Sequence, residues 1–312
     1  MHEKLVSVVI PTHNRGDLIT ETIESVLAQS YGNIEIIVVD NGSTDDTEEV
    51  IKKINAPNLQ YIKQENSGGP AGPRNHGVRR SSGEYIAFLD SDDIWLGDKI
   101  KRQVEIFEKM PEVGLVFCQC RFFGKEYHGK TIYPVKASSG NVFDDIINGN
   151  FVPTVSVVCR RAALTETGAF DESIKLRAFE DYELWMRIAY KHRFYFINEP
   201  LCLLRMHSQS MLGSDNLKSH LGAFRALCSA VNKINFSEKQ LKRSAGHHYL
   251  TTAMAWLEVR NFNNFELCLR KSLTFESDYL ALLISGLNKL IGNELLFNLY
   301  SKYRDLKKTH CR

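Results

Sequence analysis

The sequence lacks an excess of charge of one sign. Its 312 residues include 39 Lys and Arg side chains against 37 Asp and Glu, a formal net charge of +2. Nucleic-acid-binding proteins usually have a strong excess of basic residues, so this balance argues against nucleic acid as a partner. Apolar residues make up 43% of the chain, which excludes a disordered protein. The 20 glycines and 8 prolines follow no period, which excludes a collagen-like one.

Cysteine and long apolar runs are also scarce. Seven cysteines, mostly inside apolar runs, favour reduced structural thiols over a disulfide framework. A membrane span needs roughly 18 uncharged apolar residues, and Lys289 and Glu294 interrupt the best candidate, 279–300. The apolar run before Pro11 is too short for a signal peptide. We therefore expect a cytoplasmic protein, with peripheral contact at the inner face of the membrane as the alternative.

The first half of the chain alternates strand and helix patterns. Short apolar runs predict buried strands at Leu5–Ile10, Ile34–Asp40, Leu59–Lys63 and Glu84–Asp90. Helical spacing predicts helices after the first, second and fourth of these strands, at 18–27, 43–54 and 98–109. Ser43 and Asp46 have the spacing of a capping box for the second helix. Repeated units of this kind predict an α/β fold whose parallel sheet is covered on both faces.

The remainder of the chain divides near Leu212. Before it, strands are predicted at Gly114–Cys120 and Thr154–Cys159, a helix at 179–190, and either a strand or an extended segment at 201–207. After it, helical patterns occupy 219–234, 239–259, 263–273 and 280–299. We therefore predict a domain at 1–212 and an α-helical C-terminal region at 213–312.

Polar clusters follow three of the predicted strands, at 11–14, 40–43 and 90–93. In open α/β sheets, ligands bind beyond the carboxyl ends of the strands, so these clusters predict one site. Asp90 and Asp92 point the same way in an extended segment, and paired carboxylates suit a hard divalent cation. The alternative is a helix N-cap cluster before Trp95.

Two further segments carry candidate residues. The Gly-rich stretch 66–77 is neither a Walker A loop nor a dinucleotide fingerprint, but it brings Arg74 and Asn75 near a helix start. The alternative is an ordinary loop with a solvated arginine.

Glu180 and Asp181 begin the predicted helix at 179–190, where Asp181 is either a general base or one of the acidic residues common in a first turn. A lone His207 is a candidate metal ligand.

Four blocks in this order, VSVVIPTHNR, VVDNGSTDDT, GPRNHGVRRSSGEYIAFLDSDDIW and FEDYELWMR, resemble family 2 glycosyltransferases of the GT-A fold. The resemblance covers roughly residues 5–210. It implies a nucleotide-sugar-binding α/β sheet sandwiched by helices, with a C-terminal helical extension. It also implies a nucleotide-diphosphate sugar donor, a glycan or lipid-linked saccharide acceptor, and a role in cell-surface polysaccharide synthesis.

The resemblance also assigns residues. The donor-binding residues it implies are Pro11, Thr12, Asn14, Asp40, Asn41, Arg74, Asn75, Asp90 and Ser91. Mn²⁺ or Mg²⁺ is expected on Asp92, with Asp90 and His207 as further ligands. Asp181 matches the catalytic base of inverting members. Glu180 and Trp185 are expected either to contact the acceptor or to lie behind the residues that do. Many members have Asp where this chain has Asn41, so the preferred base of the donor is left open.

The expected mechanism is a single displacement with inversion, in which Asp181 takes the proton of the attacking hydroxyl. A helix N-terminus should lower the pKa of Asp181 and keep it ionised. One rival is a nucleotidyltransferase, which would carry an Arg-containing Gly-rich loop where this chain has PTHNR. The other is a non-catalytic nucleotide-sugar-binding scaffold.

The sequence of the C-terminal region leaves open whether its last helix contacts a membrane surface. Its predicted last helix can align Leu280, Leu283, Leu287, Leu290 and Ile291 on one face, followed by a basic end. Such a pattern fits an anionic membrane surface. The alternative is a helix that packs on the catalytic domain.

Overall fold

The computed structural model describes residues 3–124, 137–173, 176–206, 216–275 and 279–310. The chain forms two compact units, Met1–Leu212 and Gly213–Arg312. His207 lies outside the described residues, so its predicted role as a metal ligand has no structural counterpart here.

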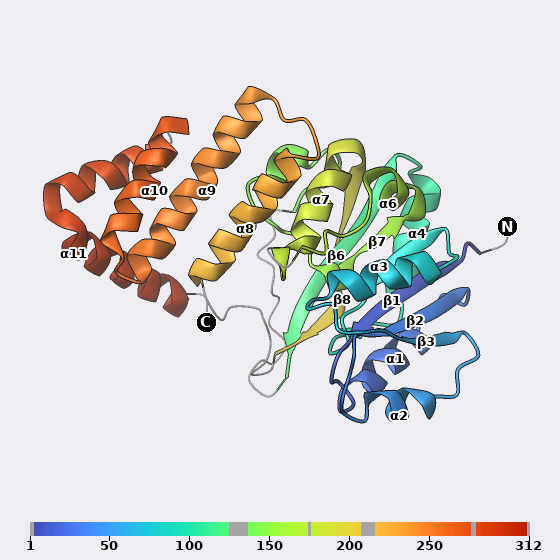
Figure 1. Cartoon of the computed structure of the whole chain (residues 1–312). Helices are drawn as coiled ribbons and strands as arrows, with labels where there is room; N and C mark the ends of the chain where they lie inside the picture. The colour runs from blue at the N-terminus through green and yellow to red at the C-terminus, as the bar shows by residue number, and fades with distance from the viewer. Residues whose placement is uncertain (1–2, 125–136, 174–175, 207–215, 276–278, 311–312) are drawn as a thin grey trace. The chain divides into compact units, whose positions relative to one another are not determined.

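The first unit is built on an eight-stranded sheet with the order β3-β2-β1-β4-β7-β6-β8-β5 (Figure 1). Its first four strands are parallel, as predicted: β1 (Val6–Thr12), β2 (Ile34–Asp40), β3 (Leu59–Lys63) and β4 (Tyr85–Phe88). The other strands are β5 (Ile94–Trp95), β6 (Val113–Phe123), β7 (Val158–Arg160) and β8 (Arg193–Arg205). Strand β7 runs antiparallel to both β4 and β6, so the sheet is mixed rather than wholly parallel.

Helices cover both faces of this sheet. Alternate β1 residues, such as Val8 and Ile10, join Ile19 and Ile23 of α1 (Ile19–Leu27) in one apolar core. On the opposite face, Val9 meets Gly77 of α3 (Ala71–Arg80), where an added Cβ would lie 2.4 Å from a Val9 methyl. Only a glycine lets the helix approach the strand this closely.

The remaining elements of the unit connect the strands. They are α2 (Thr47–Lys52), α4 (Lys99–Lys109), α5 (Phe143–Ile146), the 3₁₀ helix η1 (Thr154–Ser156), α6 (Arg161–Thr167) and α7 (Glu180–Lys191). Two local predictions are wrong. Helix α2 has no capping box, because the Ser43 hydroxyl accepts a hydrogen bond from the Asn14 backbone N–H instead. The predicted strand at Thr154–Cys159 begins as η1, and only its end joins the sheet.

The cysteines of the first unit support the prediction of structural thiols. Cys118, Cys120, Cys159 and Cys202 are all buried and unpaired. Burial raises the pKa of each of these thiols, which keeps them protonated.

The second unit consists of helices α8 (Asn216–Val231), α9 (Glu238–Glu258), α10 (Phe262–Phe275) and α11 (Tyr279–His310). Leu250 and Leu257 of α9, Phe265 of α10 and Ile284 of α11 share one apolar core. Gly292 interrupts α11 with a φ of 76°. None of the helices in the described residues is both long and apolar enough to span a bilayer.

Candidate active site

The three predicted polar clusters meet at one cleft of about 790 Å³. It lies at the carboxyl ends of β1, β2 and β4, as expected for an open α/β sheet. From the predicted set, it is lined by Pro11, Thr12, Asn14, Asn41, Arg74, Asp90, Ser91 and Asp92. The Gly-rich loop and the end of β8 complete the walls.

Asp40 does not line the cleft, although it was predicted to contact the donor. Its side chain is fully buried and accepts hydrogen bonds from the Ser43 N–H at 2.7 Å and the Tyr61 hydroxyl at 2.6 Å. Both carboxylate oxygens are therefore used inside the protein. Asp40 shapes the turn after β2, and its side chain is not exposed to the cleft.

Asn41 does line the cleft, and its amide fastens the Gly-rich loop. The side-chain oxygen accepts from the Ser67 backbone N–H at 3.0 Å and from Gln64 Nε2 at 2.9 Å. The side-chain nitrogen donates to the Gly69 carbonyl at 3.3 Å. One backbone donor and one backbone acceptor thus fix which end of the amide is which.

Arg74 and Asn75 lie within α3 and are both buried, so the alternative of a solvated loop arginine is wrong. Arg74 forms ion pairs with Asp90 and Glu180, each with a nitrogen–oxygen distance of 2.7 Å. Asn75 holds the Phe170 backbone through both ends of its amide, at 2.9 Å each, and donates to Glu172 at 2.7 Å. These contacts assign Asn75 to the protein scaffold, and it is not among the residues that line the cleft.

The aspartates after β4 are held in place by β8. The Arg205 backbone N–H donates to Asp93 at 2.8 Å, and Arg205 Nε donates to the Asp92 carbonyl at 2.9 Å. Burial, followed by the negative charge of Asp92, raises the pKa of Asp93 well above its usual range. Since β5 follows these residues and α4 begins only at Lys99, they are not a helix N-cap cluster.

Asp90 and Asp92 offer oxygen atoms to the cleft, with side chains that are 37% and 22% exposed. Hard divalent cations take carboxylate oxygens and often complete their shell with water and substrate phosphate. The two carboxylates therefore fit such an ion, although the described residues contain no cluster of three or more ligand side chains. Arg15 Nε lies 3.7 Å from Asp92 Oδ2 and adds a positive group to the same wall.

Asp181 stands in the first turn of α7, half-buried, with both carboxylate oxygens hydrogen-bonded. The Thr154 hydroxyl donates to Oδ2 at 2.7 Å, and the Tyr182 backbone N–H donates to Oδ1 at 2.6 Å. Burial, followed by the charge of Glu180, raises the pKa of Asp181 to about 6. The expected lowering of this pKa is therefore wrong in sign, because burial and the charge of Glu180 outweigh the hydrogen bonds and the Arg74 charge that favour the ionised form.

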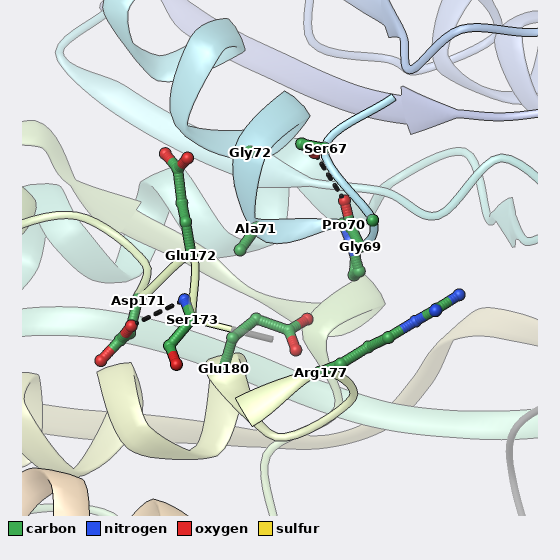
Figure 2. A pocket seen from close by; sticks show the side chains of 11 residues that line it. Ser67, Gly69, Pro70, Ala71, Gly72, Asp171, Glu172, Ser173, Arg177 and Glu180 are labelled. Carbon is green, nitrogen blue, oxygen red and sulfur yellow. Dashed lines mark hydrogen bonds between the residues drawn. The ribbon is translucent and has the colours of Figure 1, made fainter. Parts of the chain in front are cut away.

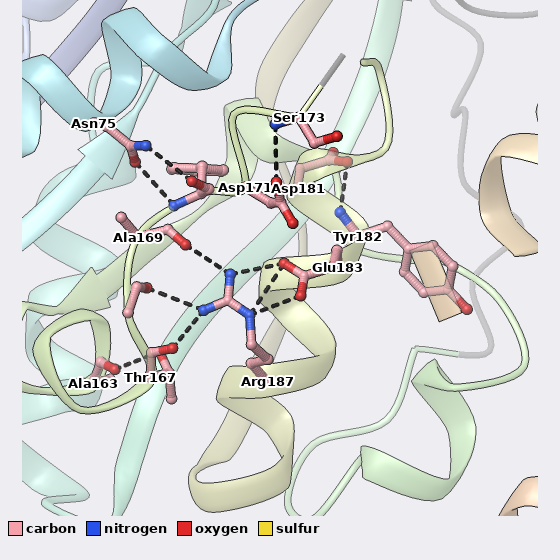
Figure 3. A network of polar contacts seen from close by, with 12 residues as sticks. Asn75, Ala163, Thr167, Ala169, Asp171, Ser173, Asp181, Tyr182, Glu183 and Arg187 are labelled. Atoms are coloured by element: carbon pink, nitrogen blue, oxygen red, sulfur yellow. Dashed lines mark hydrogen bonds and ion pairs between the residues drawn. The ribbon is translucent and has the colours of Figure 1, made fainter. Parts of the chain in front are cut away.

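The segment that leads into α7 is tied down by a buried polar network (Figure 3). Arg187 forms an ion pair with Glu183 one turn earlier on the helix, at 2.7 Å. Its guanidinium also donates to the backbone carbonyls of Thr167, Gly168 and Ala169. This network fixes residues 167–169, which lie in the chain between Thr154 and the start of α7.

Trp185 lies on the inner side of α7 and is fully buried. Its ring packs against Phe88 at 6.2 Å and Phe170 at 6.0 Å between centroids. Its side chain is therefore not exposed to the cleft and lies in the core behind it.

Glu180 lines a second hollow, between the Gly-rich loop on one side and residues 171–173 and Arg177 on the other (Figure 2). At about 10 Å³ this hollow has room for roughly one water molecule. One oxygen of Glu180 binds Arg74, and the other is buried without a hydrogen-bond partner. Arg177 lines both this hollow and the cleft.

Sequence patterns did not single out Thr154, Arg15 or Arg177 as site residues. Arg15 adjoins a strand end that was predicted to carry the site, so position along the chain was an available signal. Thr154 lies 27 residues from its partner Asp181, and no spacing rule connects the two. Only the folded structure places its hydroxyl against the carboxylate.

Comparisons with known proteins identify this architecture. The sequence model described as Glycosyl transferase family 2 matches residues 7–172. An uncharacterized glycosyltransferase of Rickettsia felis is 35% identical over 237 residues, which is 74% of this chain and 38% of that protein. The chain belongs to glycosyl transferase family 2, although it spans well under half the length of that relative.

A second relative has a more specific name. The Escherichia coli UDP-Glc:alpha-D-GlcNAc-diphosphoundecaprenol beta-1,3-glucosyltransferase WfaP is 36% identical over 188 residues, covering 60% of this chain and 71% of that protein. Among solved structures, S. aureus TarS 1-349 in complex with UDP-GlcNAc has a TM-score of 0.70 at 18% identity, covering 96% of this chain and 92% of that one. The mannosyltransferase PcManGT from Pyrobaculum calidifontis, in complex with GDP-Man and Mn²⁺, has a TM-score of 0.65 at 19% identity, covering 98% and 84%. These likenesses confirm the predicted GT-A fold.

Proposed function

We propose that this protein is an inverting, metal-dependent glycosyltransferase that moves a sugar from a nucleotide-diphosphate donor to an acceptor hydroxyl. The observation that carries the proposal is the convergence of Asp90 and Asp92 on the cleft. Asp181 is next in sequence to Glu180, which forms an ion pair with Arg74 at the same cleft. The cleft volume lies within the range of about 300–1,000 Å³ that is typical of small-molecule sites. Family membership removes the support for the nucleotidyltransferase alternative.

The donor is proposed to lie along the cleft, with its nucleoside toward Thr12 and Asn41 and its diphosphate toward Asp90 and Asp92. A UDP-sugar is the first donor to test, because WfaP is named for UDP-Glc and TarS was solved with UDP-GlcNAc. Asp92 and Asp90 would hold Mn²⁺ or Mg²⁺, with His207 as a further predicted ligand. Such an ion, when bound, neutralises charge on a leaving diphosphate.

Asp181 is proposed to act as the general base. A carboxylate with a pKa of about 6 is mostly ionised at pH 7 and can accept the proton of the attacking hydroxyl. The Thr154 hydroxyl orients it by fixing Oδ2. Attack opposite the leaving group in a single displacement gives inversion at the anomeric carbon.

The acceptor is proposed to be a glycan or a lipid-linked saccharide, since WfaP is named for a diphosphoundecaprenol-linked acceptor. Peripheral membrane contact through α11 belongs to this proposal. Leu283, Leu287 and Leu290 lie along one side of that helix and are 47%, 37% and 82% exposed. The structure corrects the predicted face, because Ile291 packs against the core of the second unit instead. The side chains of Leu280 and of the basic end lie outside those described.

Vesicle binding tests the membrane contact. Replacing Leu283, Leu287 and Leu290 with Ser in the full chain should reduce co-sedimentation with anionic phospholipid vesicles. Leu267→Ser on α10 is the matched control, because Leu267 is 53% exposed on another helix. Equal pelleting of the triple variant and the wild type would remove α11 as the contact.

A donor screen tests the function itself. UDP-, GDP- and dTDP-sugars are titrated with and without Mn²⁺ into the wild type and Asp92→Asn, and hydrolysis and transfer are followed. We expect metal-dependent binding of one donor, weakened about tenfold or more in Asp92→Asn. Binding without hydrolysis or transfer to any acceptor would instead support the scaffold alternative.

A further inference from the structure

Arg74 lies between two carboxylates that are far apart in the sequence. Its Nη1 is 2.7 Å from Glu180 and its Nη2 is 2.7 Å from Asp90. The Arg74 and Glu180 side chains are only 5% and 3% exposed, whereas Asp90 reaches the cleft. The flat fork of a guanidinium suits this arrangement, because each terminal nitrogen can bind a different carboxylate.

The surroundings of Arg74 hold the guanidinium in this position. It lies 5.5 Å from the centroid of the Phe170 ring. The backbone of Phe170 is itself fixed by Asn75, the next residue on α3. Helix α3 therefore places both the guanidinium and the aromatic ring on which it rests.

The two carboxylates belong to the two functional parts of the site. Asp90 precedes Asp92 in the proposed metal-binding pair, and Glu180 immediately precedes the proposed base. A rigid link between them fixes the start of α7 against the loop after β4. A reacting pair must be positioned closely, because an error of about 1 Å can cost about 100-fold in rate.

We propose that Arg74 is a positioning residue that sets the separation between the proposed metal-binding loop and the proposed base, and that it is not a ligand of the donor phosphates. This inference rests on the proposed function. A buried guanidinium shared between two carboxylates has its charge already compensated, which leaves little attraction for a diphosphate. The inference gives Arg74 a different role from the donor contact expected from the sequence.

The test is a double-mutant cycle of Arg74→Lys and Glu180→Gln. Lysine keeps the charge but cannot bind both carboxylates in the same geometry, and glutamine keeps the shape of Glu180 but removes its charge. We expect each single variant to lower kcat about tenfold or more while donor Kd changes less than about threefold. The double variant should be no slower than the slower single variant, because both changes break one link.

A phosphate ligand predicts a different pattern. Arg74→Lys would then weaken donor binding about tenfold or more, and Glu180→Gln would tighten it by releasing the guanidinium. That result overturns the proposal. The exposed pair Arg102–Glu199, also at 2.7 Å, supplies the control variant Arg102→Lys, which should leave kcat and Kd unchanged.

Folding and function are separated within the same experiment. If the single variants unfold, the charge-balanced pair Arg74→Met with Glu180→Met replaces them, and the same loss of kcat with intact donor binding is expected. If the wild type transfers no sugar, the proposed function fails. Binding of UDP with Mn²⁺ then still decides the role of Arg74, since only a phosphate ligand predicts tighter binding in Glu180→Gln.

Discussion

The proposed site has two sides that are built differently. The donor side consists of the strand ends at 11–15, 41–43 and 90–93 together with the Gly-rich loop, and it is held mainly by hydrogen bonds between side chains and backbone groups of facing loops. The base side consists of the described residues between 154 and 187, and it is held by the buried ion pairs of Glu180 with Arg74 and of Glu183 with Arg187, together with the hydrogen bond from Thr154 to Asp181. The cleft at the sheet edge is thus held through contacts with the backbone, whereas the segment around the proposed base Asp181 is held by buried charges.

This difference explains which parts of the fold and of the site could be predicted from the sequence. The first four strands and the polar clusters at their ends follow from apolar runs and from the rule that ligands bind at carboxyl ends. Its place at a predicted helix start made Asp181 either a general base or an ordinary acidic first-turn residue, and the family resemblance favoured the base. Its partner Thr154 and the ion pair of Glu180 with Arg74 connect residues 27 and 106 positions apart, which no local pattern encodes.

Burial also reversed expectations that rested on sequence alone. Asp40 and Trp185 are residue types that often contact ligands, but both are fully enclosed by their neighbours. The pKa of Asp181 rises because burial and the charge of Glu180 outweigh the groups that stabilise its ionised form. Solvent exposure depends on the complete packing around a residue, so it cannot be read from the residue's own segment.

The largest expected effect concerns the support of the base side. Arg187→Met leaves Glu183, which is fully buried, without its ion-pair partner. We expect the free energy of unfolding to fall by about 3–5 kcal/mol, measured by urea denaturation. Arg102→Met is the control, since an exposed ion pair contributes at most about 1 kcal/mol. Equal losses of unfolding free energy in Arg187→Met and Arg102→Met would show that the buried ion pair does not support the base side more than an exposed one would.

A medium effect is expected on the pH dependence of transfer. The Thr154 hydroxyl stabilises the ionised form of Asp181 and so lowers its pKa. Thr154→Val should therefore raise that pKa above about 6, and activity should be lost at a higher pH as the solution is acidified. The kcat–pH profiles of the two proteins measure the shift. A profile that falls at the same pH in both would show that this hydrogen bond does not tune the base.

The smallest effect is expected on the donor side. Asn41→Asp replaces the amide nitrogen that donates to the Gly69 carbonyl with an oxygen, which repels it. We expect the Gly-rich loop to loosen and donor Kd to rise by about threefold to tenfold, the loss of roughly one hydrogen bond. Calorimetry with UDP and Mn²⁺ measures this change. Tighter UDP binding would show that residue 41 contacts the nucleobase of the donor rather than holding the Gly-rich loop.

The central claim is that Asp181 is the base of a sugar transfer whose donor binds independently of it. The most direct measurement compares Asp181→Asn with the wild type, using the donor identified by the screen. We predict that kcat falls by about 100-fold to 10,000-fold, the usual share of general base catalysis, while donor Kd stays unchanged. Transfer at the wild-type rate in Asp181→Asn would contradict the account.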